Sequence, residues 1–160
     1  MALLEWSDAL VLDVPAMDDT HEEFVELLAQ VDAATDDILV HAWDVLIAHT
    51  EEHFGREDEW MRATGFSAAN CHTTQHRVVL SVMREGAQQG AAGRLDVIRQ
   101  MAGELAPWFV QHAQSMDAGL ALHLRSVGFD LETGRIGRAG ALPAAPITGC
   151  GSAACSPATR

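Results

Sequence analysis

The stretch EEHFGREDEWM, residues 51–61, decides the fold that we predict for this chain. It continues an apolar stripe with the period of a core-facing helix, formed by Val40, Trp43, Leu46, Ile47, Thr50, Phe54 and Met61. His53 and Glu57 fall inside this stripe, four residues and about 40° apart around the axis. A buried carboxylate is costly unless something pairs with it, and a metal ion takes both a carboxylate and a neutral imidazole as ligands. The stretch therefore predicts a helix with metal ligands on its inward face.

Composition favours one soluble domain. The chain has 160 residues and is 48% hydrophobic, so it can bury a stable hydrophobic core without cross-links. No apolar run reaches the length of a membrane span, and the first residues, MALLEWSDALVLDV, lack the basic segment of a secretory signal. We therefore expect a cytoplasmic protein. The net charge of −13 disfavours nucleic acid and anionic membranes as partners.

Two missing residue types and the spacing of the cysteines exclude several classes of functional site. The chain has no lysine, which excludes Schiff-base and P-loop chemistry, and no tyrosine, which excludes a tyrosyl-radical enzyme. The three cysteines, Cys71, Cys150 and Cys155, do not make a zinc pair with suitable spacing. An odd count without a signal peptide predicts reduced thiols.

Three further helical patterns accompany the one around residues 51–61. In the first, Asp19 is predicted as the N-cap, with Glu22 reaching back from the third position. A third helix should begin after Ser67 and end near Gly86–Gly90. The last spans roughly residues 92–127 and contains Pro107, which should kink or interrupt it.

Four helices with short connections predict an all-α, antiparallel up-down-up-down four-helix bundle. We expect this domain to cover residues 1–132, with residues 1–16 as an extended arm along its body. Residues 133–160 are rich in Gly, Ala, Pro and Ser and are predicted to form a disordered tail with incidental thiols.

Each predicted helix carries residues of metal-ligand type within its apolar stripe. They are His21, His53, Glu57, His72, His76, His112 and Asp117. A lone inward histidine is more often a hydrogen-bonded core residue, but seven such residues without metal would leave several buried polar groups unpaired. The set is too large for one ion and predicts two ions bridged by the carboxylates. His112 and Asp117 lie about 140° apart on a regular helix, so either the helix is irregular there or these ligands approach from different sides.

The runs WSDAL, MDDTHEEF, HFGREDEWM, HTTQH and WFVQHAQSMD resemble those of hemerythrins, most closely bacterial hemerythrins. The resemblance covers about residues 6–125 and matches all seven ligand positions. It implies a non-haem di-iron site, with an oxide or hydroxide bridge, that binds O2 reversibly. By this pattern one iron has three histidines (His72, His76, His112), the other has two (His21, His53), and Glu57 and Asp117 bridge them. The second iron then keeps an open position for O2.

The resemblance also implies an oxygen pocket lined by Phe24, Phe54 and Trp108, although all three also suit plain core packing. Three positions depart from the family pattern, and at one of them Asp58 follows Glu57 where a second Glu is common. His49 stands where an aromatic residue is usual, and we interpret it as a tolerated buried or half-buried histidine rather than a partner of a ligand or a competing ligand. Ala113 stands where a larger aliphatic residue is usual, which predicts faster oxygen exchange and autoxidation.

Ligand type favours an oxygen-binding protein over an enzyme, and we expect the protein to be a monomer. Ferritin-like di-iron enzymes use four carboxylates, whereas two carboxylates and neutral imidazoles keep the reduced irons accessible, so that oxygen can leave again. Two alternatives stay open: a di-iron enzyme that reduces peroxide or nitric oxide, and a protein that stores or donates iron.

Overall fold

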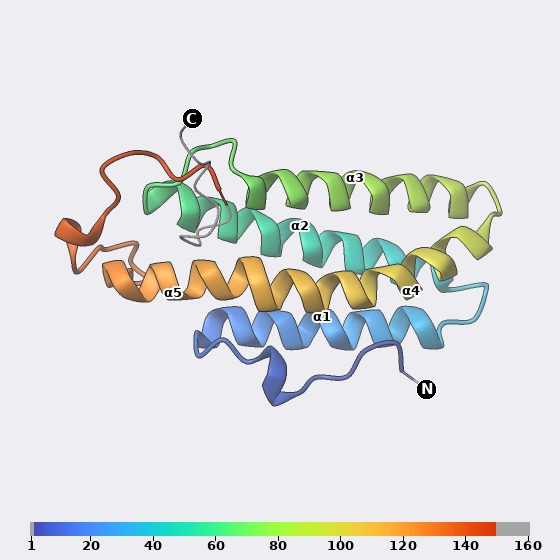
Figure 1. Cartoon of the computed structure of the whole chain (residues 1–160). Helices are drawn as coiled ribbons and strands as arrows, with labels where there is room; N and C mark the ends of the chain where they lie inside the picture. Colours follow the sequence, from blue (N-terminus) through green and yellow to red (C-terminus); the bar gives the residue numbers. More distant parts are fainter. Residues whose placement is uncertain (1, 150–160) are drawn as a thin grey trace.

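The computed structural model describes residues 2–149, and its long elements are all helices. They are α1 (Pro15–Ala33), α2 (Leu39–Ala63), α3 (Cys71–Ala91), α4 (Leu95–His112) and α5 (Ala118–Val127). A π-helical turn, η2 (Ala113–Asp117), joins α4 to α5, so that these elements form one rod (Figure 1). Consecutive helices pack against each other and α4 also packs on α1, which closes the bundle. The predicted four-helix bundle is confirmed.

Helix α1 begins four residues before the predicted N-cap. Its first residue is Pro15, and Val14 occupies the N-cap position. Proline suits the first helical position because its fixed φ is already helical and its missing N–H would have no partner there. The prediction that Asp19 caps this helix is therefore wrong.

Helix α3 begins later than predicted, and it ends one residue after the predicted range Gly86–Gly90. Asn70, not Ser67, is the N-cap: its Oδ1 accepts the backbone N–H of Thr73 at 2.9 Å, in a reciprocal capping box. The helix continues past Gly86 and Gly90, both buried, to Ala91. A Cβ on either glycine would overlap a side chain of α4, so these glycines allow close helix packing and do not end the helix.

The fourth rod is irregular, but not at the proline. Helix α4 runs through Pro107 without interruption and ends at His112. In η2 the backbone N–H of Ala118 donates to the carbonyl of Ala113, five residues earlier, which is the bonding of a π turn. The helix is therefore not interrupted at Pro107, and a kink there stays a prediction. Between His112 and Asp117 the structure has the irregularity that was one of the two alternatives.

The hydrophobic core has two clusters, and the predicted ligands lie between them along the helices. One cluster contains Phe24 and Ala113, and the other contains Met17 and Leu120. His21 follows Met17 and precedes Phe24 on α1, and Asp117 lies between Ala113 and Leu120 on the fourth rod. The ligand layer is thus closed by apolar residues on both sides.

Both ends of the described chain make backbone hydrogen bonds. Residues Asp8–Leu10 form a short 3-10 turn, so a wholly extended N-terminal arm is not confirmed. At the other end, the N–H of Ile147 donates to the carbonyl of Gly65 at 2.9 Å, and the N–H of Ser67 donates to the carbonyl of Ile147 at 2.8 Å. Ile147 therefore pairs with the α2–α3 connection, while the disordered tail that we predict for residues 133–160 stays a prediction. Residues 150–160 of that tail lie outside the described residues, and a domain boundary at residue 132 stays a prediction.

The structure also bears on the expectations for membrane spans and for the cysteines. Among the described residues, no helix combines the length and the apolar character that a membrane crossing requires. Cys71 is disulfide-bonded, so the prediction of a reduced thiol is wrong at this residue. Cys150 and Cys155 lie outside the described residues.

Candidate metal centre

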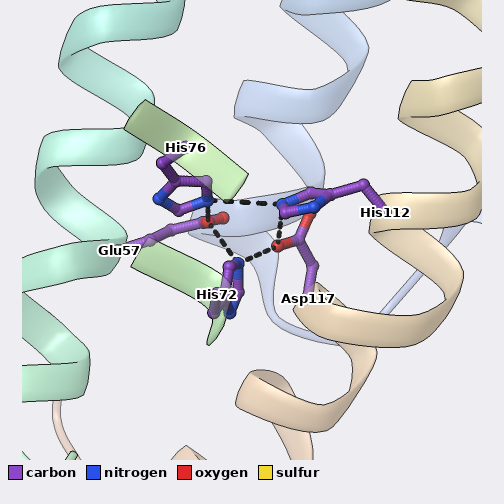
Figure 2. Close-up of side chains that lie close together, drawn as sticks. All are labelled: Glu57, His72, His76, His112 and Asp117. Atoms are coloured by element: carbon purple, nitrogen blue, oxygen red, sulfur yellow. Dashed lines mark hydrogen bonds and ion pairs between the residues drawn. The ribbon is translucent and has the colours of Figure 1, made fainter. Parts of the chain in front are cut away.

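All seven predicted ligands come together in the middle of the bundle, and none is more than 3% exposed. Helix α1 supplies one, α2 two and α3 two, while α4 and η2 each end on one: His21, His53, Glu57, His72, His76, His112 and Asp117. Figure 2 shows five of them pointing toward a common centre from three sides. The helical register therefore places every predicted ligand on an inward face.

The seven side chains form two groups that share both carboxylates. One comprises Glu57, His72, His76, His112 and Asp117, and the other comprises His21, His53, Glu57 and Asp117. Within each group one ligand atom per residue lies within 4.8 Å of all the others, a spacing that could hold a metal ion. We refer to them as the three-histidine group and the two-histidine group.

Glu57 faces each group with a different oxygen. Its Oε2 lies 3.3 Å from Nε2 of His76, in the three-histidine group. Its Oε1 lies 2.8 Å from Nε2 of His53, in the two-histidine group. His53 and Glu57 are one turn apart on α2, so the helix itself sets this contact. A carboxylate in this position can bridge two ions.

Asp117 divides its oxygens in the same way. Its Oδ1 is 3.0 Å from Nε2 of His72 and 3.1 Å from Nε2 of His112, while its Oδ2 is 3.2 Å from Nε2 of His21. The π turn makes this possible, because an i to i+5 hydrogen bond brings residues five apart toward one face. A regular helix would turn Asp117 away from His112.

The residues fit a metal pair because several ligand atoms are buried without a hydrogen bond. Both Asp117 oxygens, Oε2 of Glu57, and Nε2 of His21 and His72 are in this state, although some lie within 3.2 Å of one another. These atoms lie close to one another, but they do not meet the criteria for hydrogen bonds. Orphaned buried polar atoms are rare, and so many in one layer are explained by cations that all of them could ligate.

The histidine tautomers support the same conclusion. Nδ1 of His76 lies 2.7 Å from Oδ1 of Asp58, and Nδ1 of His112 lies 3.1 Å from Oε1 of Gln75. Both oxygens accept, so each Nδ1–H donates and each Nε2 is left with its lone pair. The two Nε2 atoms are only 3.3 Å apart. Two lone pairs at this distance require a cation between them, either a proton or a metal.

The two buried carboxylates favour protonation of the imidazoles beside them. Burial lowers the pKa of His21 and His72, but Asp117 and Glu57 outweigh this effect and raise the values to about 10 and about 9. Burial would raise the pKa of Glu57 and of Asp117, yet the neighbouring imidazoles hold both well below their usual range. Both carboxylates are therefore ionised, and a metal cation would replace the imidazole protons.

A comparison with known families adds independent support. A family model described as "Hemerythrin HHE cation binding domain" matches residues 12–122. The chain belongs to the hemerythrin family. It is 38% identical over 130 residues to a bacteriohemerythrin of Ralstonia nicotianae, an alignment that covers 81% of this chain and 95% of that protein. A bacteriohemerythrin of Aquifex aeolicus is 29% identical over 117 residues, which cover 68% of this chain and 87% of that one.

The aromatic residues surround this hemerythrin-family centre unequally. Phe54 stacks on His76 with ring centroids 3.9 Å apart, and Trp108 stacks on His112 at 4.6 Å, so both contact the three-histidine group. Phe24 stacks on Phe109 at 4.3 Å. Phe109 contacts the ring of His21, a member of the two-histidine group, edge-on at 5.3 Å. Phe24 and Phe109 together therefore form an apolar wall beside that group.

Sequence reasoning missed Phe109 and instead named its neighbour Trp108 as a pocket residue. The structure buries Phe109, one residue further on, and leaves Trp108 half-buried. A stripe drawn through Leu105, Phe109 and His112, with spacings of four and three, would have found it. Asp58 and Gln75 were also missed as partners of the ligand histidines, and no periodic signal marks them.

His49 does not belong to either metal group in the part of the chain that the structure describes. Its Nε2 lies 3.1 Å from Oε2 of Glu23 on α1, and its side chain is 15% exposed. Burial lowers its pKa, and Glu23 opposes that shift only in part. Its partial burial agrees with the prediction of a buried or half-buried histidine.

Proposed function

We propose that this chain binds O2 reversibly at two iron ions held by the seven converging residues. The observation that carries the proposal is the unequal division of the ligands: two groups share both carboxylates, but one has three histidines and the other has two. The hemerythrin family assignment supports iron as the metal. A solvent-derived oxide or hydroxide would complete the bridge between the ions.

Counting donors places the open position. Three imidazoles, two carboxylate oxygens and a solvent bridge would give the first ion six ligands. His21 and His53 with the same three bridges would give the second ion five. The pair of ferrous ions would supply the electrons that bind O2, and the two-histidine group would leave room for it.

The chain's own residues keep this position dry. Phe109 lies edge-on to His21, Phe24 stacks behind Phe109, and Ala113 is fully buried in the same apolar cluster. Exclusion of water limits loss of the bound ligand by side reactions. The ring of Phe54 also lies 5.3 Å from that of His53, so we propose Phe24, Phe54 and Phe109 as the lining of the oxygen pocket. The structure turns Trp108 toward His112 of the other group.

Reversible binding is favoured over turnover by the donor set. Only two carboxylates lie among the seven residues, so the ions would keep net positive charge and a stable reduced state. No tyrosine is present anywhere in the chain to supply an electron to the metals. A peroxide- or nitric oxide-reducing enzyme and an iron donor remain the rival functions.

The deciding experiment cycles oxygen over reduced, iron-loaded protein. We expect two irons per chain and a visible absorption band that appears when O2 is admitted to the anaerobic protein and disappears when O2 is removed. Turnover of peroxide or nitric oxide with an electron donor, faster than autoxidation, would instead establish an enzyme. Rapid loss of both irons to a weak chelator would favour an iron donor.

A further inference from the structure

The two metal groups differ in the hydrogen bonds that the Nδ1 atoms of their histidines make. In the three-histidine group, His76 donates from Nδ1 to the carboxylate of Asp58 at 2.7 Å, and His112 donates from Nδ1 to the amide oxygen of Gln75 at 3.1 Å. Asp58 comes from α2 and Gln75 from α3, so each bond ties a ligand to a neighbouring helix. Two of the three imidazoles in this group are therefore fixed in tautomer and in orientation.

The two-histidine group has no such support within the described residues. Nδ1 of His21 and Nδ1 of His53 are both buried and have no hydrogen-bond partner. The rings are positioned by aromatic contacts, with Phe109 5.3 Å from His21 and Phe54 5.3 Å from His53. Such contacts hold a ring in place but do not select which nitrogen carries the proton.

We propose that Asp58 and Gln75 are positioning residues that make the three-histidine group the tighter of the two metal sites. The ion at His21 and His53 then leaves first. An outer carboxylate fixes the ligand tautomer and makes the imidazole a stronger donor, and loss of such a partner costs about 10–100-fold in metal affinity. This inference rests on the metal pair of the proposed function, but it does not depend on oxygen binding.

Anaerobic release of ferrous iron to an excess of chelator tests the order. The wild-type protein, loaded with two irons, should release them in two phases of equal amplitude. Asp58→Asn keeps the side-chain shape but removes the charge, and it should accelerate the slow phase about 10–100-fold. The fast phase should stay unchanged. Asp44→Asn is the matched control, because it makes the same substitution at an exposed position of the same helix.

A spectroscopic readout separates positioning from mere stability. One equivalent of Co²⁺ should enter the three-histidine group, and its visible absorption should shift in Asp58→Asn but not in Asp44→Asn. Asp58→Glu, which restores a carboxylate, should recover the slow phase at least in part. Gln75→Leu provides a second route from another helix if Asp58→Asn does not fold, and it should also accelerate only the slow phase.

Three results would overturn the inference: release of both irons from the wild type in one phase, equal acceleration of both phases in Asp58→Asn, or acceleration of the fast phase alone. Any of them would leave oxygen binding untouched, since no O2 enters the assay. Conversely, two-phase release from a protein that shows no oxygen-dependent band would support the order of metal loss and reject the proposed function.

Discussion

Glu57→Gln keeps the shape of the side chain that both metal groups share and removes its charge. Glu57 is fully buried, 2.8 Å from Nε2 of His53 and 3.3 Å from Nε2 of His76. Removing one partner of a buried charge pair costs about 3–5 kcal/mol. In a chain of this length 1 kcal/mol shifts the melting temperature by about 2–4 °C. The metal-free variant should therefore melt roughly 6–20 °C below the metal-free wild type.

Calorimetry of both metal-free proteins at neutral pH measures this difference. Glu52→Gln, exposed on the same helix, is the control and should change stability by no more than about 0.5 kcal/mol. Burial raises the pKa of Glu57, but His53 and the other imidazoles lower it well below its usual range, so its stabilisation is lost as pH falls through that lowered value. The deficit of the variant should shrink in acid. Equal melting at neutral pH, or normal loading of two irons by Glu57→Gln, would refute the shared role of this carboxylate.

Three further predictions concern protons and the oxygen pocket. Because the pKa values of His21 and His72 are raised from 6.5 to about 10 and about 9, iron loading at pH 7 should release protons to an indicator dye. Metal affinity should then rise with pH toward pH 9–10, and a flat pH profile would contradict these assignments. Phe109→Ala removes a buried ring stacked on Phe24, so it should cost about 3–5 kcal/mol in chemical denaturation and speed autoxidation. Ala113→Ile overfills a buried position at a cost of about 1–3 kcal/mol. It should slow autoxidation, and an unchanged rate would reject a role for Ala113 in the pocket.

The bundle and the convergence of the ligands could be predicted from sequence because both follow from helical periodicity. His53 and Glu57, or His72 and His76, lie four residues apart within apolar stripes, and such residues must face the same side of a helix. Burial of the stripe then brings the ligands of all four rods into one layer. Spacing alone carried this part of the prediction.

Helix ends and outer partners could not be predicted in this way. Val14 precedes Pro15 without a polar cap, and Asn70 was overlooked beside Ser67 because both are good capping residues. The bond from His76 to Asp58 crosses between two helices, and its formation depends on their relative rotation, which the sequence does not state. The hydrogen bond between Ile147 and Gly65 could not be predicted for a similar reason. It joins two backbone groups, so no side-chain type in this low-complexity segment marks it.

The π turn links the irregularity of the last rod to the chemistry of the centre. Five residues separate His112 from Asp117, and a regular helix would place them about 140° apart. The turn at Ala113–Asp117 instead lets Asp117 meet both His112 and His21 while Leu120 and Leu124 of α5 still face the core. Pro107, the residue most expected to disturb this rod, does not interrupt it. The rod thus departs from regular geometry where one carboxylate must serve both groups, which indicates that ligand placement, not helix propensity, sets its local structure.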